Sequence, residues 1–281
     1  MKKYLVIGNP IDHSLSPLIH NYWIKKYNLI DCVYEKRKVE EENLGRIVDQ
    51  IRSDELIGVN ITVPFKKKII PFLDNLDADA TDTQSVNTLF KQHDGQVIGI
   101  NTDVQGFSQS LIEEKTEIHR TVLDKYRGKD IFILGAGGVT PSIIYILRLT
   151  ANKIYITNRT KEKAEKLKNE ETKWGSKKNI EVLDWGEKPK VCDLVINTTS
   201  VGLKKDENLG LEFKEYKSNK NTLFYDVIYN PKETNFLKDA RLRGNKTMNG
   251  KMMFLYQAQL AFLKWTKVYP HIDEEVIRLL D

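Results

Sequence analysis

Short apolar runs and longer amphipathic segments alternate along the first hundred residues. Short apolar runs that end at glycine or proline predict buried strands, whereas apolar residues recurring every three or four positions predict helices. The last two apolar runs flank His93-Asp94-Gly95, which is a hairpin signal. The pattern predicts a βαβαβ lobe with a terminal hairpin, with strands at 4–8, 33–39, 56–62, 87–90 and 96–100 and helices at 17–27 and 40–52.

The remainder of the chain continues this alternation. A predicted helix over 104–111 carries the chain between two lobes, and a polar stretch over 113–129 follows it. Strands separated by single helices are typical of a parallel, doubly wound α/β sheet of the Rossmann-like type. The sequence position of the last predicted helix does not reveal which lobe it joins. The predicted strands are 131–134, 153–157, 181–183, 194–197 and 223–227, and the predicted helices are 139–149, 161–168 and 250–265.

The composition is that of an ordinary globular protein with a mild positive charge. Of 281 residues, 40% are hydrophobic and 30% are charged, and 44 basic against 39 acidic residues give a net charge of +5. Because the basic residues are spread along the chain, the charge slightly favours anionic small molecules as partners. It excludes the clustered basic stripe of a nucleic-acid binder.

Cysteine usage and hydropathy bear on the compartment. Cys32 and Cys192 lie far apart without metal-ligand spacing, which fits packed thiols in a reducing, cytoplasmic environment and predicts no metal site. No run approaches the roughly 18 apolar residues that a membrane span needs. The first apolar run is short and ends in Gly8-Asn9-Pro10, so it predicts a strand rather than a signal sequence.

A glycine-rich turn, Gly135-Ala136-Gly137-Gly138, follows the predicted strand at 131–134. A strand, such a turn and a helix form a cradle in which backbone N–H groups approach the pyrophosphate of a dinucleotide. The fingerprint is incomplete, because Thr140 stands where a third glycine would be, although Pro141 is tolerated in a first helical turn. The context favours cofactor binding, and a purely structural strand–helix corner is the alternative.

The next predicted strand ends at Asn158-Arg159-Thr160, near the place where an NAD site carries an acidic residue for the ribose. No carboxylate is present there. A guanidinium with neighbouring hydroxyls suits a 2′-phosphate, because it donates charge-assisted hydrogen bonds to it. The segment therefore favours NADP over NAD, and the alternative is a surface arginine that forms a salt bridge with a nearby helix.

Lys66 and Asp103 each follow a predicted strand of the first lobe. Ligands of α/β sheets bind outside the carboxyl ends of the strands, so both side chains are expected at that edge. An aspartate that holds an ammonium group in a partly buried site makes the lysine a usable acid/base. Lys67 and Lys68 are interpreted as a solvated turn, which is also the alternative for Lys66.

Nine short motifs occur in order along nearly the whole chain. They are 14–17, 60–66, 85–88, 99–106, 135–138, 158–160, 196–202, 226–231 and 250–258. Each motif is weak alone, but nine in order are specific. Together they resemble the shikimate dehydrogenase family.

The resemblance implies reversible NADPH-dependent reduction of 3-dehydroshikimate to shikimate, within chorismate and aromatic amino-acid biosynthesis. It implies Lys66 as the acid/base and Asp103 as its partner. It also implies a discontinuous substrate-binding and catalytic domain (1–104 plus 247–281), an NADP-binding domain (105–246) and an active site in the cleft between them.

The resemblance extends to individual ligand contacts. The implied substrate contacts are Ser14, Ser16, Thr62, Lys66, Asn87, Asp103, Tyr229 and Gln257. The expected cofactor contacts are Gly135, Ala136, Gly137, Gly138, Val139, Asn158, Arg159, Thr160, Lys163, Thr199, Val227 and Gly250, of which Val227 and Gly250 would line the nicotinamide.

Several of these side chains have structural alternatives. Ser14 and Ser16 could cap the helix that begins near Pro17. Tyr229 could be a packed edge residue, and Gln257 could be a buried glutamine with local partners on an otherwise apolar helix.

The chain also departs from the family pattern in three places. Thr140-Pro141 alters the glycine turn, which affects the expected details of phosphate binding. Lys163 stands where some members have a second arginine for the 2′-phosphate. Phe254 replaces a usual leucine, and only local repacking is expected from it.

The leading hypothesis is an NADP-dependent shikimate dehydrogenase that acts on a small molecule, has no nucleic-acid or membrane partner, and is a monomer or homodimer. A quinate/shikimate dehydrogenase that uses NAD is the nearest alternative, although Arg159 argues against a preference for NAD. A non-catalytic ligand-binding regulator on the same scaffold is another. Lys66 and Asp103 argue against the regulator, because a binding protein needs no proton-transfer pair.

Overall fold

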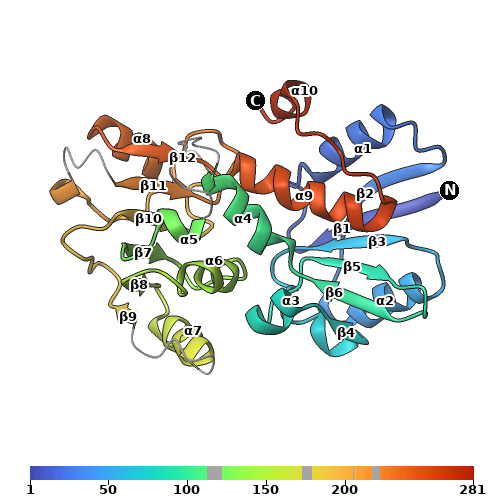
Figure 1. Cartoon of the computed structure of the whole chain (residues 1–281), viewed down its shortest axis with the longest axis horizontal. Helices are drawn as coiled ribbons and strands as arrows, with labels where there is room; N and C mark the ends of the chain where they lie inside the picture. Colours follow the sequence, from blue (N-terminus) through green and yellow to red (C-terminus); the bar gives the residue numbers. More distant parts are fainter. Residues whose placement is uncertain (113–121, 173–178, 205, 217–221) are drawn as a thin grey trace. The chain divides into compact units, whose positions relative to one another are not determined.

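The computed structural model describes residues 1–112, 122–172, 179–204, 206–216 and 222–281 (Figure 1). The described chain forms two compact units, each with its own six-stranded sheet. The first unit comprises Met1–Gly106 and Leu255–Asp281, and the second comprises Phe107–Phe254. The divisions fall within helices α4 (Thr102–Ile112) and α9 (Lys251–Thr266). The predicted α/β class is confirmed.

The first unit alternates strands and helices before it ends in a hairpin and the C-terminal helices. Besides parts of α4 and α9, its elements are β1 (Lys2–Gly8), α1 (Ser16–Lys26), β2 (Cys32–Lys38), η1 (Glu41–Asn43), α2 (Leu44–Arg52), β3 (Gly58–Ile61), η2 (Ile70–Phe72), β4 (Asn75–Leu76), α3 (Ala78–Thr83), β5 (Thr88–Lys91), β6 (Val97–Ile100) and α10 (Glu274–Arg278).

The strand directions in the first sheet bring distant segments to one edge. Its order is β2-β1-β3-β5-β6-β4. Strands β1, β2 and β3 are parallel, whereas β5 is antiparallel to both β3 and β6. Strand β6 therefore runs in the same direction as β1 and β3. The carboxyl ends of β1, β3 and β6 and the beginning of β5 meet at one edge of the sheet.

Alternating side chains of β1 serve two separate cores, because successive residues of a strand point to opposite faces. Leu5 and Ile7 belong to a buried cluster that includes the apolar face of α2. On the other face, Tyr4 packs against Trp265 of α9, with ring centroids 5.4 Å apart. Gly58 makes this close approach possible, because a Cβ there would lie 2.2 Å from the Trp265 indole nitrogen.

The second unit is a parallel sheet covered by helices. Besides parts of α4 and α9, its elements are α5 (Val122–Lys125), β7 (Asp130–Leu134), α6 (Thr140–Leu147), β8 (Lys153–Thr157), α7 (Lys161–Thr172), β9 (Ile180–Leu183), β10 (Leu194–Asn197), η3 (Lys214–Tyr216), β11 (Leu223–Asp226), α8 (Asn235–Leu242) and β12 (Lys246–Met248).

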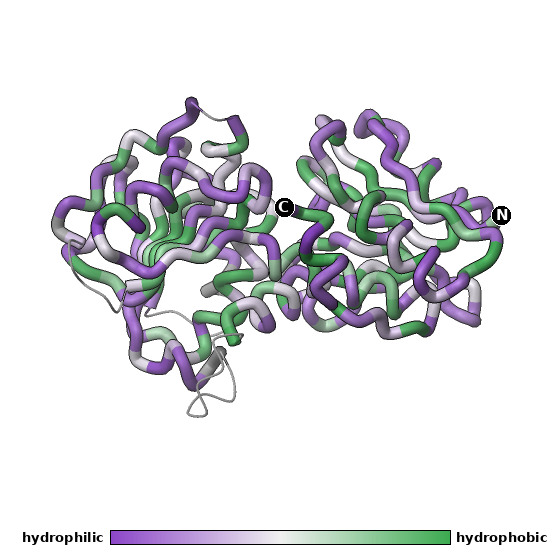
Figure 2. Tube along the Cα trace, turned by 90° about the horizontal axis from the view of Figure 1, so that it is seen from above, coloured by the Kyte–Doolittle hydropathy of each residue, from purple (hydrophilic) through white to green (hydrophobic). Residues whose placement is uncertain are grey.

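The second sheet has the strand order of a dinucleotide-binding fold. All its pairs are parallel, and the order β9-β8-β7-β10-β11-β12 is the 3-2-1-4-5-6 order of that fold. The chain reverses its direction of winding between β7 and β10. In such sheets ligands bind outside the carboxyl ends of the strands at this switch point. The central strands are hydrophobic (Figure 2) because helices bury both faces of a parallel sheet.

Short elements account for most differences from the predicted pattern. The predicted helix at 40–52 is a 3₁₀ turn without buried residues, followed by α2, which begins at the buried Leu44. The helix predicted at 139–149 is shorter, with bounds Thr140–Leu147. Strands β4 and β12 and helices α3, α5, α8 and α10 are additional, and residues 113–121 of the polar stretch lie outside the described residues.

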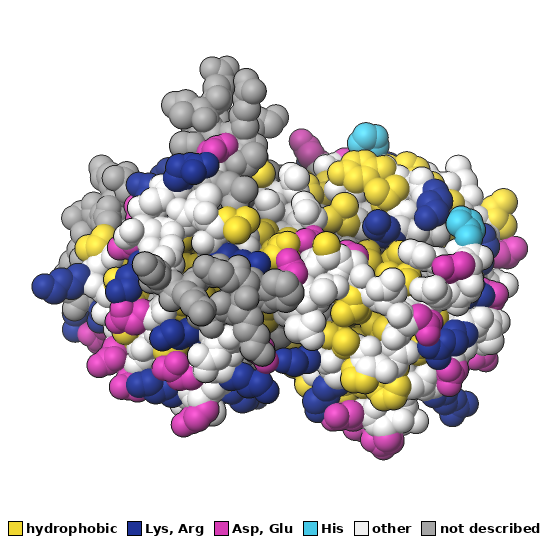
Figure 3. Space-filling view, turned by 60° about the horizontal axis from the view of Figure 1, so that its bottom comes forward, with side chains coloured by type: hydrophobic (Ala, Val, Ile, Leu, Met, Phe, Trp, Pro, Cys, Tyr) yellow, Lys and Arg dark blue, Asp and Glu magenta, His cyan; other side chains and the backbone are white. Residues whose placement is uncertain are grey.

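The surface of the described residues is mixed in charge. On the face that Figure 3 shows, basic and acidic side chains are interspersed and form no continuous basic stripe among the described residues. The helices that the structure describes include none long and apolar enough to cross a membrane.

Candidate functional site

The Lys66 ammonium forms an ion pair with the Asp103 carboxylate. Lys66 follows β3 through Thr62, Val63, Pro64 and Phe65, and Asp103 lies in the first turn of α4 directly after β6. Their side chains are only 12% and 8% exposed. The solvated turn expected for Lys67 and Lys68 does not extend to Lys66. The pair lies at the edge where β3 and β6 end, so an acid/base and its partner occupy the ligand-binding edge of this sheet.

Asn87 links this pair to β5, the strand that runs antiparallel to β3 and β6. It lies directly before β5, and its Nδ2 donates to Asp103 Oδ1 at 2.9 Å and to Thr102 Oγ1 at 2.9 Å. Its Oδ1 accepts a hydrogen bond from the Thr102 backbone N–H at 2.9 Å. The Asp103 backbone N–H donates to Asn101 Oδ1 at 3.1 Å. The carboxylate itself is held by Asn87 at Oδ1 and by Lys66 at Oδ2, and the remaining bonds fix the backbone that carries it.

The two serines of the first loop lie together at the same sheet edge. Ser14 Oγ and Ser16 Oγ are 3.3 Å apart, and the Ser16 backbone N–H donates to Ser14 Oγ at 3.4 Å. Helix α1 begins at Ser16, and its N-cap residue is Leu15, with no side-chain capping hydrogen bond. The N-cap residue Leu15 has no polar side chain, but Ser14 Oγ accepts from the N–H of the first helical residue, so the structure retains part of the capping alternative for Ser14. Two adjacent hydroxyls are a suitable donor pair for a carboxylate.

Thr62 reaches this edge because of a glycine at the end of β1. Its backbone N–H donates to the Ile7 carbonyl at 2.9 Å, and a Cβ at Gly8 would lie 2.6 Å from Thr62 Cγ2. Gln257 is half-buried in the same unit, on α9, and precedes Trp265 by eight residues or about 12 Å of helix. The first unit thus contains every predicted substrate residue except Tyr229.

The glycine turn of the second unit lies at its switch point. Gly135 has φ +114°, and a Cβ there would lie 2.6 Å from Thr198 Oγ1 and 2.9 Å from Thr199 Cγ2, both directly after β10. Only glycine fits such a conformation without strain. Gly137 and Gly138 are exposed, so the tip of the turn is open to an approaching ligand.

Thr140 holds this turn in place of the missing third glycine. Its Oγ1 accepts a hydrogen bond from the Gly137 N–H at 3.1 Å and lies 2.9 Å from Thr198 Oγ1. The Ala136 N–H donates to Asn158 Oδ1 at 3.2 Å. The threonine therefore closes the turn with side-chain bonds, and the N–H groups of Ala136 and Gly137 are already engaged within the protein. Val139 is the N-cap residue of α6.

The segment after β8 presents a cation, Arg159, beside the turn. Asn158 bonds both to Ala136 and, through Nδ2, to the Thr160 carbonyl at 2.8 Å. Arg159, Thr160 and Lys163 are exposed, and Arg159 forms no salt bridge with any residue that the structure describes. The alternative of a structural arginine paired with a helix is therefore not observed. Its guanidinium remains available to an anion.

The buried Asp226 carboxylate organises the segments that carry Thr199 and Val227, two of the predicted cofactor residues. Asp226 accepts hydrogen bonds from Asn197 Nδ2 at 3.1 Å, the Ile228 N–H at 3.0 Å and Thr234 Oγ1 at 2.6 Å. Burial raises the pKa of this carboxyl to about 6, against the lowering effect of those bonds. Asn197 Oδ1 in turn accepts bonds from Thr199 N and Oγ1 at 3.0 and 2.7 Å. The network fixes Thr199 and the segment that begins with Val227.

Val227 and Gly250 are in direct contact. A Cβ at Gly250 would lie 2.1 Å from the Val227 carbonyl oxygen, so only glycine allows the two segments to approach. Tyr229 lies two residues further and stacks on Phe254, with ring centroids 4.3 Å apart. The sequence motifs contained Thr102, Asn101, Asn197 and Asp226, but their inward-facing structural roles gave no separate signal.

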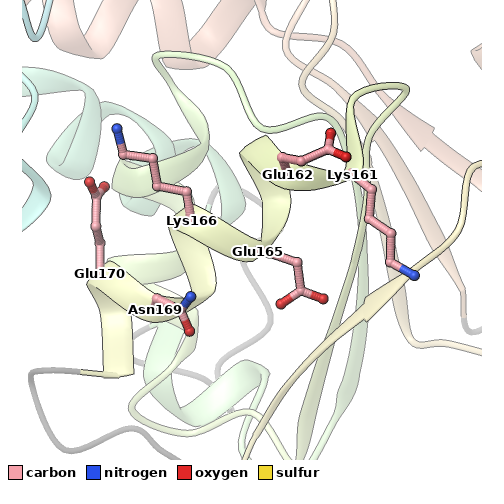
Figure 4. Close-up of a pocket in the computed structure, with 6 residues that line it drawn as sticks. All are labelled: Lys161, Glu162, Glu165, Lys166, Asn169 and Glu170. Carbon is pink, nitrogen blue, oxygen red and sulfur yellow. The ribbon is translucent and has the colours of Figure 1, made fainter.

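The described residues offer no competing site. A cavity of about 550 Å³ lies along one face of α7 (Figure 4), and its lining residues run from Lys161 to Glu170 without any of the predicted site residues. Within the described ranges, no cluster of three or more His, Cys, Asp or Glu side chains could hold a metal ion.

Comparisons with known proteins cover the whole chain. The family described as shikimate dehydrogenase substrate binding domain matches residues 6–89, and that described as shikimate / quinate 5-dehydrogenase matches residues 117–235. A shikimate dehydrogenase (NADP⁺) of Pelagibacter ubique is 50% identical over 281 residues, which cover 100% of this chain and 99% of the relative.

Solved structures agree. A shikimate dehydrogenase in complex with NADP⁺ is 33% identical with a TM-score of 0.85, covering 100% of this chain and 94% of that one. The Thermus thermophilus enzyme in complex with NADP(H) and shikimate is 28% identical with a TM-score of 0.83, and both chains are covered completely.

Proposed function

This chain belongs to the shikimate dehydrogenase family, and we propose on that premise that it catalyses the reversible NADPH-dependent reduction of 3-dehydroshikimate to shikimate. The step belongs to the biosynthesis of chorismate and the aromatic amino acids. The observation that carries the proposal is the Lys66–Asp103 ion pair, held by Asn87 at the ligand-binding edge of the first sheet. A ligand-binding regulator would not need such a proton-transfer pair.

The residues of the first unit account for the proton chemistry. In the reductive direction the Lys66 ammonium donates a proton to the ketone oxygen as hydride reaches the carbonyl carbon, and in the reverse direction its amine takes the hydroxyl proton. Asp103 keeps the ammonium in position. When bound, NADPH supplies the hydride. The hydroxyls of Ser14 and Ser16 hold the substrate carboxylate, and the amide and carboxylate groups of Asn87, Asp103 and Gln257 hold ring hydroxyls.

The second unit has features that fit the dinucleotide. The exposed Gly137 and Gly138 leave room for the pyrophosphate, and the exposed Arg159 guanidinium, which has no salt bridge to the described residues, matches a 2′-phosphate. Val227 and Gly250 are assigned to the nicotinamide. We assign the substrate to residues 1–104 with 247–281 and NADP to residues 105–246, in a cytoplasmic monomer or homodimer.

A matrix of four assays tests this function. Shikimate and quinate are each incubated with NADP⁺ and with NAD⁺, and the absorbance of the reduced nicotinamide is followed. The proposal expects the highest kcat/KM for shikimate with NADP⁺. Faster turnover of quinate with NAD⁺ would favour the quinate/shikimate alternative, and the absence of turnover in all four assays would favour a binding protein.

A further inference from the structure

Three buried polar side chains lie behind Asn87, on the side away from Asp103. Tyr34 of β2, Asn60 of β3 and Thr88 of β5 are 2%, 6% and 0% exposed. The backbone ladders of these strands are complete without them. Buried polar groups are costly unless they are hydrogen-bonded, and apolar residues would pack a sheet face at lower cost. Their hydrogen-bond partners explain why polar residues occupy these positions.

The chemistry of the acceptors fixes the direction of each hydrogen bond. The Asp103 carboxylate only accepts and the Thr102 backbone N–H only donates, so Asn87 must direct Nδ2 to Asp103 and Oδ1 to Thr102. Thr88 Oγ1 lies 3.1 Å from that Asn87 Oδ1 and must donate to it. The orientation of the Asn87 amide is therefore determined by its partners.

The same reasoning extends to the outer members. Asn60 Nδ2 donates to the Asn87 backbone carbonyl at 3.1 Å and to Thr88 Oγ1 at 2.9 Å, so its Oδ1 is directed outward. Tyr34 Oη lies 2.6 Å from Asn60 Oδ1 and must donate to it. The donors Tyr34, Asn60, Thr88 and Asn87 thus point in one direction along the chain, which ends at the Asp103 carboxylate.

Tyr34, at the outer end of this chain of hydrogen bonds, is itself held in place. The Asn21 side chain bonds to both the backbone N–H and the carbonyl of Tyr34, at 3.0 and 2.8 Å. The Tyr34 ring stacks on His20, with centroids 4.2 Å apart and planes at 3°. Among the described residues, the ionisable Lys66 ammonium pairs with Asp103 at one end of the hydrogen-bond chain, and the ionisable His20 imidazole stacks on Tyr34 at the other. The phenol therefore has one well-defined position from which to donate.

We propose that Tyr34, Asn60 and Thr88 are positioning residues, which act through the Asn87 amide to hold the Asp103 carboxylate in the orientation that pairs with Lys66. This inference rests on the proposed function and extends it to residues that touch neither substrate nor cofactor. Hydrogen bonds aligned in one direction polarise one another, so the chain strengthens the last bond to the carboxylate. Loss of an inner member leaves Asn87 less constrained and the catalytic pair less ordered.

The test compares two substitutions of Thr88. Thr88→Val keeps the shape and removes the hydroxyl, whereas Thr88→Ser keeps the hydroxyl. We expect Thr88→Val to lower kcat/KM for shikimate roughly 3- to 10-fold, the worth of about one net hydrogen bond, with KM for NADP⁺ unchanged. Thr88→Ser should restore most of that loss. Equal effects of valine and serine, or an unchanged kcat/KM in Thr88→Val, would overturn the proposal.

Thr222 supplies a matched control. It is a fully buried threonine of the second unit, whose hydroxyl bonds to the Cys192 carbonyl at 2.7 Å. Thr222→Val should lower the melting temperature without a selective loss of kcat/KM. If it lowers kcat/KM as much as Thr88→Val, the effect at Thr88 is a general cost of burying valine and the proposal fails.

Tyr34→Phe provides a second variant if Thr88→Val does not fold. It removes only the outermost donor and should lower kcat/KM for shikimate by about 2-fold or more, again without changing KM for NADP⁺. If Tyr34→Phe keeps the wild-type kcat/KM, the proposal that Tyr34 acts through this chain of hydrogen bonds is overturned. A failure of the proposed function can be told apart from a failure of this inference. If the proposed function is wrong, the wild-type protein itself shows no turnover of shikimate with NADP⁺.

Discussion

Phe254 stacks on Tyr229, with ring centroids 4.3 Å apart and ring planes at 15°. The resemblance described above implies a leucine at this position, so that only local repacking is expected from the phenylalanine. The structure shows the form that this repacking takes. A phenyl ring gives the Tyr229 ring a parallel partner, which a leucine side chain does not provide.

The stack on Phe254 should help Tyr229 to bind the substrate. Aromatic pairs contribute about 0.5–1.5 kcal/mol beyond their buried area. If the stack orients Tyr229 for substrate binding, Phe254→Leu should raise KM for shikimate about 2- to 10-fold and leave KM for NADP⁺ unchanged. Steady-state kinetics with each substrate varied in turn measure both constants. An unchanged KM for shikimate would mean that Tyr229 holds its position without Phe254.

Arg159 should determine the preference for NADP. It is exposed and forms no salt bridge to the described residues, so its guanidinium can meet the 2′-phosphate at little cost. A charged hydrogen-bonded contact is worth roughly 1.5–3 kcal/mol, so Arg159→Ala should weaken NADP⁺ binding about 10- to 100-fold and leave NAD⁺ binding nearly unchanged. Calorimetric titration measures both affinities.

Arg241 is the control for that experiment. It is also exposed and in the same unit, but it pairs with Glu233. Arg241→Ala should change neither affinity. Equal weakening of NADP⁺ and NAD⁺ by Arg159→Ala would mean that Arg159 contacts the part that the two dinucleotides share.

Ser14 and Ser16 should bind the substrate carboxylate. Leu15 is the N-cap of α1, and the hydrogen bond that Ser14 Oγ accepts from the Ser16 N–H is long, at 3.4 Å, so removal of either hydroxyl should change the melting temperature little. Ser14→Ala or Ser16→Ala should raise KM for shikimate about 10-fold or more, since a hydrogen bond to a charged group is lost. Ser53→Ala, an exposed serine of the same unit, is the control. A lower melting temperature with an unchanged KM would assign these serines to helix capping after all.

His20 should make the folded protein sensitive to acid. It is 1% exposed, neither ring nitrogen has a hydrogen-bond partner among the described residues, and burial lowers the pKa of its imidazole to about 3. In the unfolded chain the imidazole takes up a proton near pH 6.5, whereas in the folded protein it stays neutral. The unfolding free energy is therefore unaffected by the titration of His20 above pH 6.5 and decreases as the pH falls from 6.5 toward 3. The difference corresponds to about 5 kcal/mol of unfolding free energy.

Comparison with His20→Phe isolates this contribution from that of the carboxylates. Denaturant titrations of both proteins between pH 3 and pH 7 give the unfolding free energies. The wild-type value should fall relative to that of the variant below about pH 6.5. Parallel curves over the whole range would contradict a buried neutral histidine.

The parts of the fold that the sequence predicted are those with strong hydrophobic patterns. The strands at 153–157 and 194–197 have the predicted bounds. Residues 194–197 are all buried, whereas in 153–157 the buried Ile154 and Ile156 alternate with the half-buried Lys153 and Tyr155. The short elements β4 and β12 were missed. Asn75–Leu76 and Lys246–Met248 contain too few apolar residues for a pattern, and their strand conformation comes from pairing with neighbouring strands.

The site was predictable to the extent that its residues follow strands. Lys66 and Asp103 were placed at one edge because each comes directly after a strand, and the structure brings them into contact. The role of Thr140 could not be predicted, because its bonds to Gly137 and Thr198 depend on the approach of the segment after β10. Asn60 and Thr88 lie within the motifs 60–66 and 85–88, but their hydrogen-bonding roles could not be predicted, since their partners lie on neighbouring strands.

The central claim is that Lys66 transfers the proton in the NADP-dependent oxidation of shikimate. Its most direct test is kcat for shikimate oxidation by Lys66→Ala, measured together with NADP⁺ affinity and with Lys68→Ala as the control, since Lys68 is an exposed partner of Glu41. The account predicts that Lys66→Ala lowers kcat by about 10²–10⁴ with unchanged NADP⁺ affinity, while Lys68→Ala behaves as the wild type. Full turnover by a folded Lys66→Ala protein would contradict it.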